Sequence, residues 1–177
     1  VAYAQWLTTI IGIDPGSRFT GFGIISDHQG VQCAVDFGVI RAQGEQLSER
    51  LYSIHQQLKQ LRAKHQLDAL AIEGVFFSKN AQSALKLGQA RGAAISAIMS
   101  DELPCFEYSP RQVKQSIVGI GSASKVQVQH MVRSLLKLRQ TPATDAADAL
   151  AIALCHCHQQ RLAHTLKRSQ ITAGDGA

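Results

Sequence analysis

The fold of this chain is decided by residues 141–154, which read TPATDAADALAIAL. Thr141 can cap the first free amides of a helix, and Pro142 suits the first helical position because its missing N–H costs nothing there. Alanine and leucine favour helix over most of the stretch. We therefore predict a helix that begins at Pro142, and we expect it to be largely buried because its side chains are mostly small or apolar.

Two carboxylates stand on this otherwise apolar helix. Asp145 and Asp148 are three residues apart, so they are neighbours on one face. Adjacent carboxylates repel each other and resist losing their water, and a hard divalent cation is the counterion that best offsets both costs. A second interpretation is open at this point: Asp145 lies near the helix N-terminus, where the macrodipole favours an acid, and Asp148 points to water.

Length and composition are those of one globular domain. The chain has 177 residues, of which 45% are hydrophobic, and its net charge is +5. It contains no apolar run long enough to span a membrane, and its first eight residues lack the blocks of a signal peptide. Its scattered cysteines are typical of a reducing compartment, so we expect a cytoplasmic protein without membrane contact. The basic charge suits a polyanionic partner but is a weak signal alone.

The order of the elements predicts an α/β fold. Apolar and β-branched runs joined by tight turns indicate an antiparallel meander of three strands, and two later runs, reached through helices, indicate parallel strands. The expected strands are residues 9–13, 21–25, 31–40, 67–72 and 104–108. We expect a five-stranded mixed sheet flanked by helices in one domain (residues 9–160), between an N-terminal extension (residues 1–8) and a disordered tail (residues 161–177).

Helices are indicated by apolar spacing and by capping residues. Apolar residues recur at helical spacing over residues 47–61, and capping boxes start helices at Ser109 and Ser124. A helix over residues 81–100, capped by Asn80, carries small residues near one face. That face allows close approach of another helix, either within the chain or in a dimer, and the pattern does not separate the two.

Two further carboxylates end expected strands. Asp14 follows the first strand and Glu73 follows the fourth. Open α/β sheets place ligands at the carboxyl ends of parallel strands, where the helix carrying Asp145 and Asp148 can pack across them. Four carboxylates carry about −4, which two Mg²⁺ ions would balance, and such a pair of ions supports phosphodiester cleavage. The four acids are therefore candidate metal ligands and catalytic residues.

A second group of metal-binding residue types is not expected to form a site. Residues 155–158 read CHCH, but neighbouring residues on a helix point about 100° apart, so these side chains cannot converge on one ion. We expect His130 and His156 at the surface or at helix caps rather than in catalysis.

Four motifs stand in a fixed order along the chain. They are IDPG at residues 13–16, IE at 72–73 followed by VFF at 75–77, ALKLGQARG at 84–92 and DAADA at 145–149. In this order and at these spacings they resemble the RuvC family of crossover junction endodeoxyribonucleases, over about residues 9–158. The resemblance implies a ribonuclease-H-like fold and a homodimer that binds four-way (Holliday) DNA junctions and nicks two opposed strands in recombination and repair.

The resemblance also implies roles for individual residues. The four acids match the family's metal ligands, with two Mg²⁺ per active site and Mn²⁺ as a possible substitute. Lys114 and Lys125 resemble basic residues that support phosphate binding near the cut, and Phe76 resembles the aromatic residue that wedges into the junction. The helix over residues 81–100 resembles the dimer interface, and the implied partner is the RuvA–RuvB branch-migration complex. From their places on loops and helices near the acids, further candidate DNA contacts are Lys79, Arg91 and Arg111.

The chain departs from the family pattern in three places. Gly74 follows the glutamate where a longer polar residue is expected, Ser124 stands where an acid usually precedes the lysine, and Arg139-Gln140 replaces the usual Pro-Gly. None of these is a metal ligand. We expect a looser loop after Glu73 and a different loop shape before the helix that carries Asp145.

Two other classes of protein are open. An actin-like ATPase or sugar kinase shares the opening strand, Asp14 and the meander, but needs two lobes to enclose a nucleotide, and this chain has the length of one. A non-catalytic DNA-binding module would keep the fold, although an idle acidic cluster repels phosphates. The interpretation that we favour is a Mg²⁺-dependent endonuclease that resolves four-way junctions by two-metal phosphodiester hydrolysis.

Overall fold

The computed structural model describes residues 7–74, 80–100 and 102–174 of the chain. Its strands are β1 (Leu7–Asp14), β2 (Phe19–His28), β3 (Val31–Arg41), β4 (Ala69–Glu73) and β5 (Cys105–Tyr108). Its helices are α1 (Leu47–Lys64), α2 (Ala81–Ile98), α3 (Pro110–Val118), α4 (Lys125–Leu135) and α5 (Thr144–Gly174). In this part of the chain no helix is both long and apolar enough to cross a bilayer.

The strands form one mixed sheet in the order β3-β2-β1-β4-β5. The first three are antiparallel neighbours, whereas β4 pairs in parallel with β1 and with β5. Gln29 and Gly30 close the β2–β3 hairpin with φ of 53° and 88°, as a tight hairpin turn requires. The predicted α/β fold with a five-stranded mixed sheet is confirmed. β1 begins at Leu7, so it includes two residues that we had assigned to the N-terminal extension.

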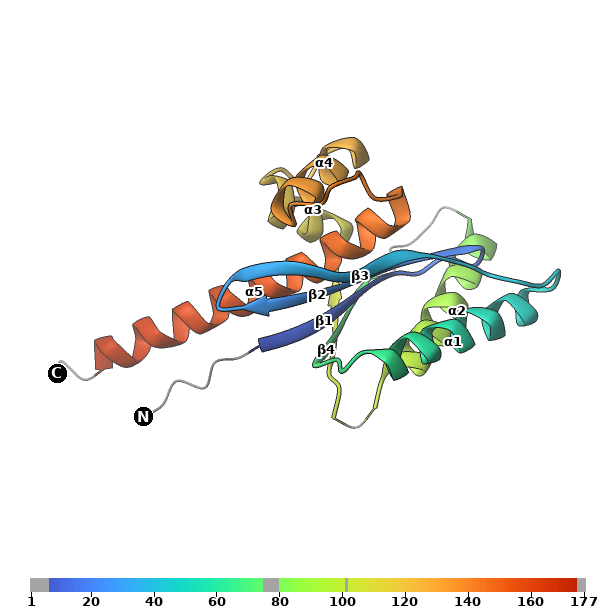
Figure 1. Cartoon of the computed structure of the whole chain (residues 1–177), viewed down its shortest axis with the longest axis horizontal. Helices are drawn as coiled ribbons and strands as arrows, with labels where there is room; N and C mark the ends of the chain where they lie inside the picture. Colours follow the sequence, from blue (N-terminus) through green and yellow to red (C-terminus); the bar gives the residue numbers. More distant parts are fainter. Residues whose placement is uncertain (1–6, 75–79, 101, 175–177) are drawn as a thin grey trace.

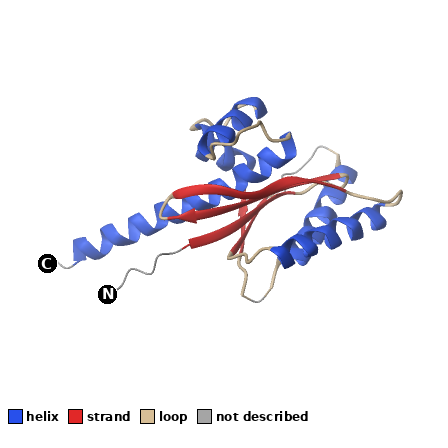
Figure 2. Cartoon of the chain, in the orientation of Figure 1, coloured by secondary structure: helices blue, strands red, loops and turns tan. Residues whose placement is uncertain are grey.

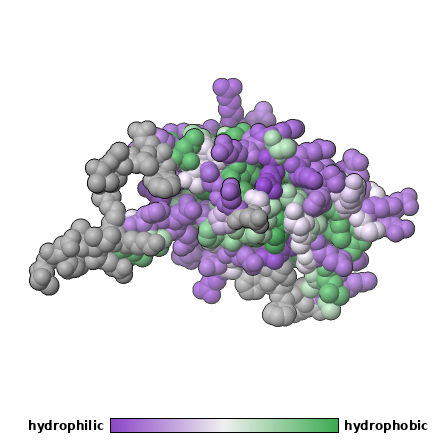
Figure 3. Space-filling view, turned by 90° about the horizontal axis from the view of Figure 1, so that it is seen from below, coloured by the Kyte–Doolittle hydropathy of each residue, from purple (hydrophilic) through white to green (hydrophobic). Residues whose placement is uncertain are grey.

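Helices cover both faces of the sheet (Figure 1, Figure 2). α1 and α2 pack together on one face, and α3, α4 and α5 lie on the other. Each layer has its own apolar cluster: Ile11 and Leu70 face α1 and α2, whereas Ile10 and Ala71 face α5. The alternation follows from the opposite directions of successive side chains along a strand. Seen from below, the outer surface is mainly hydrophilic with small hydrophobic areas (Figure 3).

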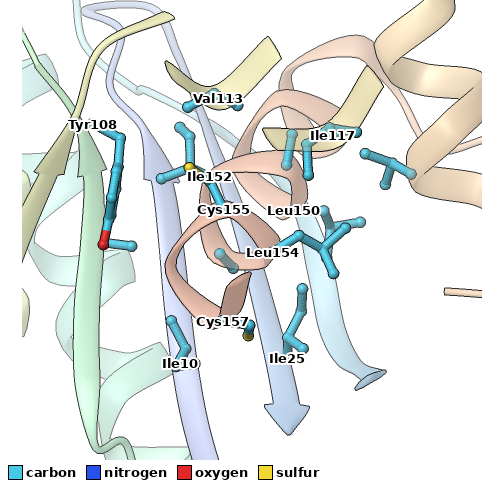
Figure 4. Packing of buried hydrophobic residues seen from close by; sticks show 14 of the residues in the cluster. Ile10, Ile25, Tyr108, Val113, Ile117, Leu150, Ile152, Leu154, Cys155 and Cys157 are labelled. Carbon is cyan, nitrogen blue, oxygen red and sulfur yellow. The ribbon is translucent and has the colours of Figure 1, made fainter. Parts of the chain in front are cut away.

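Two glycines of the sheet allow the N-terminal half of α5 to pack closely against the strands. A Cβ on Gly12 would overlap the backbone of Ala149, and a Cβ on Gly21 would overlap the backbone of Asp145. The helix therefore lies directly on β1 and β2. Leu150 and its neighbours on α5 fill the apolar cluster between the sheet and α3 (Figure 4).

The start of α5 differs from the prediction. The capping boxes at Ser109 and Ser124 are confirmed, but α5 begins at Thr144, so Pro142 is not its first residue and Thr141 does not cap it. The Ala143 carbonyl instead accepts the first helical hydrogen bond, from the Ala147 amide. Pro142 is buried, and its carbonyl accepts a hydrogen bond from a glutamine of α4. This tertiary contact holds the preceding residues in a loop.

The end of α5 also differs from the prediction. We expected a disordered tail from residue 161, but the helix continues to Gly174. Leucine, alanine, arginine, lysine and glutamine favour helix, and no proline or glycine interrupts the segment before Gly174. Leu162 and Leu166 are more than half exposed, because this end of α5 projects beyond the core (Figure 1). The low apolar content excluded burial, but it did not exclude helix.

Candidate active site

Asp14 and Glu73 stand side by side at the carboxyl ends of β1 and β4. The residues before them, Ile13 and Ile72, are register partners in the parallel ladder. On its other side Asp14 pairs with Gly21 of β2. The structure thus places the two strand-borne acids together at the carboxyl ends of neighbouring parallel strands.

α5 brings the other two acids to this edge of the sheet. Asp145 lies in the first turn of α5, and its backbone rests on Gly21, the register partner of Asp14. Asp148 follows three residues later, and both side chains are half-buried. Gly21 sets the height of the helix above Asp14, because any side chain there would push the helix away.

Burial and neighbouring carboxylates raise the pKa values of two of the four acids, Asp14 and Glu73. The pKa of Asp14 is raised to about 7, with burial as the largest cause. The charges of Glu73, Asp148 and Asp145 add to this rise, and Lys125 opposes it. The pKa of Glu73 is also raised, first by burial and then by Asp148. A cation among these groups would lower both pKa values, because it favours the charged forms.

Two lysines share a hollow with three of these acids. The hollow has a volume of about 170 Å³. Its polar lining consists of Asp14, Glu73, Lys114, Lys125 and Asp148. The Lys125 Nζ donates to Asp148 Oδ2 at 3.1 Å, and this hydrogen bond raises the pKa of Lys125. Lys125 offsets part of the acidic charge, while its side chain stays 68% exposed and within reach of a ligand from solvent.

The chemistry of these donors suits a hard divalent cation. The candidate ligands are all carboxylates, the oxygen ligands that Mg²⁺ prefers. Within the described ranges no three acidic, histidine or cysteine side chains lie close enough to hold one ion together. Burial, together with the neighbouring acids, raises the pKa of Asp14 although Lys125 opposes the rise, so a bound cation would favour the charged carboxylate. The residues therefore suit a metal site, but their side chains would have to move closer together when a cation binds.

The structure describes only some of the predicted DNA contacts, and those that it describes differ in how free they are to bind DNA. Phe76 and Lys79 lie outside the described residues. Arg111 is exposed on α3. Arg91 of α2 is committed to protein contacts, since its Nε donates to the Glu73 carbonyl and its guanidinium pairs with Glu107.

Sequence reasoning missed the apolar wall of the hollow. This wall consists of Pro110, Val113, Val128 and Ile152. The signal was present in the helical spacing, because Ile152 stands four residues after Asp148 and Val128 three residues after Lys125. Such a wall limits water beside the acids and accounts for the burial that raises their pKa values.

A buried tyrosine–histidine pair was also missed. His156 was expected at the surface or at a cap, but it is 1% exposed. Its Nδ1 shares a hydrogen bond of 2.7 Å with Tyr108 Oη, and its ring packs on Phe106. Burial lowers the pKa of His156 to about 4. Because Tyr108 is the register partner of Glu73, this bond links the strand edge at the site to α5. A histidine within an apolar helix was the available signal.

Comparisons with known proteins agree in sequence and in structure. Residues 10–156 match the family model of the crossover junction endodeoxyribonuclease RuvC. The RuvC of Tolumonas auensis is 54% identical over 155 residues, which cover 88% of this chain and 90% of that protein. T. thermophilus RuvC in complex with a Holliday junction substrate matches with a TM-score of 0.81 at 33% identity, over 88% of this chain and 96% of that chain. The yeast mitochondrial Holliday junction resolvase Ydc2 shares the fold, with a TM-score of 0.66 at 14% identity, over 92% and 83% of the two chains.

The mixed sheet, with acids at the ends of β1 and β4 and on α5, defines a nuclease of ribonuclease-H-like fold. The chain belongs to the RuvC family of crossover junction endodeoxyribonucleases. The resemblance noted in the sequence is therefore confirmed, and the ATPase and sugar-kinase interpretations are excluded.

Proposed function

We propose that this chain cleaves four-way DNA junctions with the help of two Mg²⁺ ions held by Asp14, Glu73, Asp145 and Asp148. One observation carries the proposal: acids from β1, β4 and α5 gather around one hollow and raise the pKa of Asp14. The membership of the RuvC family supplies the substrate class.

The chain's own residues have distinct tasks in this proposal. Two bound divalent ions supply the activation of water and the stabilisation of the leaving oxygen in phosphodiester cleavage. Asp14, whose pKa is raised by burial and by all three other acids, would hold the ions together with Glu73, Asp145 and Asp148. Lys125, which donates to Asp148 in the structure, could pair with the scissile phosphate if bound cations offset the acidic charge. Lys114, which also lines the hollow, stabilises the developing negative charge.

We propose that two copies pair through α2 and so present two active sites to two opposed strands. Gly88 and Gly92 are exposed, and a Cβ on either would meet nothing within 4 Å. Leu85, on the same helix, is 67% exposed. Small residues beside an exposed leucine allow another helix to approach closely and to bury apolar surface.

The remaining contacts are proposed from the family membership. Phe76 and Lys79 lie in sequence between Glu73 and α2, and stacking of an aromatic ring on a base is worth about 1–3 kcal/mol. Arg111 would contact the DNA backbone directly, whereas Arg91 could do so only if its ion pair with Glu107 opened. We also propose a cytoplasmic setting and cooperation with the RuvA–RuvB branch-migration complex.

The proposal is tested by incubating the purified protein with a synthetic four-way junction in Mg²⁺, in Mn²⁺ and in EDTA. We expect symmetric nicks in either metal and none in EDTA. Asp14→Asn should abolish cleavage and retain junction binding. Glu102→Gln is the matched control and should cleave normally, because it removes an exposed acid before the amino end of β5, whereas Glu73 pairs with the carboxyl end of that strand.

Undiminished nicking by Asp14→Asn in Mg²⁺ would overturn the assignment of the acids. Tight junction binding without nicking in any divalent metal would favour the non-catalytic DNA-binding module.

A further inference from the structure

The positive charge of the molecule is concentrated in one segment. Residues 108–144, which contain α3 and α4, hold six lysines and arginines and no aspartate or glutamate. The rest of the chain holds 12 lysines and arginines against 13 acids. The whole net charge of +5 therefore comes from this segment. Only two of its six cations, Lys114 and Lys125, line the active-site hollow.

A second hollow lies at the C-terminal end of α4. Its volume is about 430 Å³. It is lined by His130, Arg133, Ser134, Lys137 and Leu138. Arg133 and Lys137 are exposed, and among the ion pairs of the described residues neither has a carboxylate partner. This hollow, which we name the α4-end hollow, thus presents positive charge that the protein does not neutralise.

The backbone holds these two cations together. Lys137 has a φ of 51°, a left-handed conformation in which glycine is the favoured residue at helix ends. Its neighbours Leu136 and Leu138 both contact the apolar cluster under α5. The Lys137 amide donates to the Ser134 carbonyl, and the Leu138 amide donates to the Arg133 carbonyl. The chain therefore keeps lysine where glycine would cost less, and the anchored turn aims it outward beside Arg133.

We propose that the α4-end hollow binds the phosphate backbone of one arm of the DNA junction, at a position away from the phosphate that is cut. Charge complementarity selects a polyanion, and α4 links the hollow to the active site, since Lys125 begins the helix that carries Arg133. These two residues are separated by about 12 Å along the helix axis. One strand of a duplex presents a phosphate about every 3.4 Å along its axis, so a bound arm reaches both positions within a few base pairs. This inference rests on the proposed function.

The test measures junction binding in the Asp14→Asn background, where the DNA stays intact, at several salt concentrations in Mg²⁺. Arg133→Gln removes one cation, and Lys137→Gly removes the other while relieving the backbone. Each change should weaken binding by about three- to tenfold at low salt and reduce the slope of log K against log salt by about 1. Lys137→Gly should not lower the melting temperature, so that its weaker binding cannot be ascribed to misfolding.

Two control variants match these changes on other parts of the molecule. Lys59→Gln removes an exposed cation from α1, on the opposite face of the sheet. Gln29→Gly relieves the second of the two left-handed non-glycine residues in the described part of the chain. Both should bind as the parent does. Parental affinity and slope in Arg133→Gln and Lys137→Gly would overturn the inference, as would an equal loss in Lys59→Gln. Failure of the proposed function has a different signature, which is absence of nicking by the chain with Asp14 intact.

Discussion

Asp14 occupies an environment that opposes its charge. Burial and three neighbouring acids raise its pKa to about 7, whereas in the unfolded chain it ionises near its ordinary value. The folded protein therefore binds a proton at Asp14 that the unfolded chain has already lost, and the associated stability is lost as the pH rises from about 4 to 7.

Asp14→Asn should accordingly be more stable than the parent at pH 8 in EDTA, by on the order of 2–4 kcal/mol, and similar to it near pH 4. Urea unfolding at the two pH values measures the difference. Added Mg²⁺ should stabilise the parent and leave Asp14→Asn nearly unchanged. A constant difference between the two proteins at all pH values would contradict the assigned pKa.

The contribution of His156 to the stability of the fold changes with pH in the opposite direction. Its pKa is lowered to about 4 by burial, so the unfolded chain takes up its proton at a higher pH than the folded protein does. The stabilisation is complete above about 6.5 and is lost as the pH falls toward 4.

Comparing the parent with His156→Gln isolates this contribution, because Asp14 titrates in both proteins. From pH 7 to pH 4 the parent should lose up to about 3 kcal/mol of unfolding free energy relative to the variant. Denaturant unfolding across this pH range measures it. Parallel stability curves would show that His156 is not held neutral.

At the scale of the element, the contact of α5 with the sheet depends on glycine. A Cβ on Gly12 would overlap the backbone of Ala149, and backbone cannot move aside as a flexible side chain can. Gly88 on α2 has open space where its Cβ would be. A side chain at Gly12 should therefore disturb the packing of the monomer, whereas a side chain at Gly88 should not.

Gly12→Ala should destabilise the fold by about 3 kcal/mol or more, because α5 must shift off the sheet. Gly88→Ala should stabilise the monomer by up to about 1 kcal/mol through helix propensity and weaken dimerisation if α2 is the interface. Thermal unfolding and sedimentation of both variants separate the effects. Equal losses of stability would contradict the packing of α5 described above.

The ends of the helices show which features of the fold could be predicted from the sequence and which could not. The antiparallel meander and the capping boxes at Ser109 and Ser124 followed from local patterns, since the deciding groups are close in sequence. The start of α5 did not, because a hydrogen bond from Gln129 to the Pro142 carbonyl fixes the loop before it. The glycines beneath α5 were missed for the same reason: their partners are more than a hundred residues away.

At the scale of the whole molecule, the sequence predicted the acids but not their surroundings. Asp14, Glu73, Asp145 and Asp148 were recognisable because each ends a strand or opens a helix in an apolar context. The apolar wall with Ile152, and the burial of His156, required knowing which faces of α3, α4 and β5 meet α5. Such contacts come from the packing of elements and leave only a weak trace in local spacing.

If two copies pair as proposed and each holds its own four acids, a dimer of mixed composition should be half active. A heterodimer of the parent and Asp14→Asn, purified through two different tags, should nick one strand of a junction and leave the opposed strand intact. Gel analysis of end-labelled strands measures both cuts. Two cuts by the heterodimer would mean that one active site can serve both strands.

The four acids of this nuclease come from the beginning, the middle and the last part of the chain. Two of them lie on α5, which also contributes many residues to one apolar core cluster. A nascent chain released before α5, or a copy in which α5 has come away from the sheet, lacks half of the set. If the four acids act together as proposed, such incomplete molecules should not cut DNA, because they lack two of the ligands.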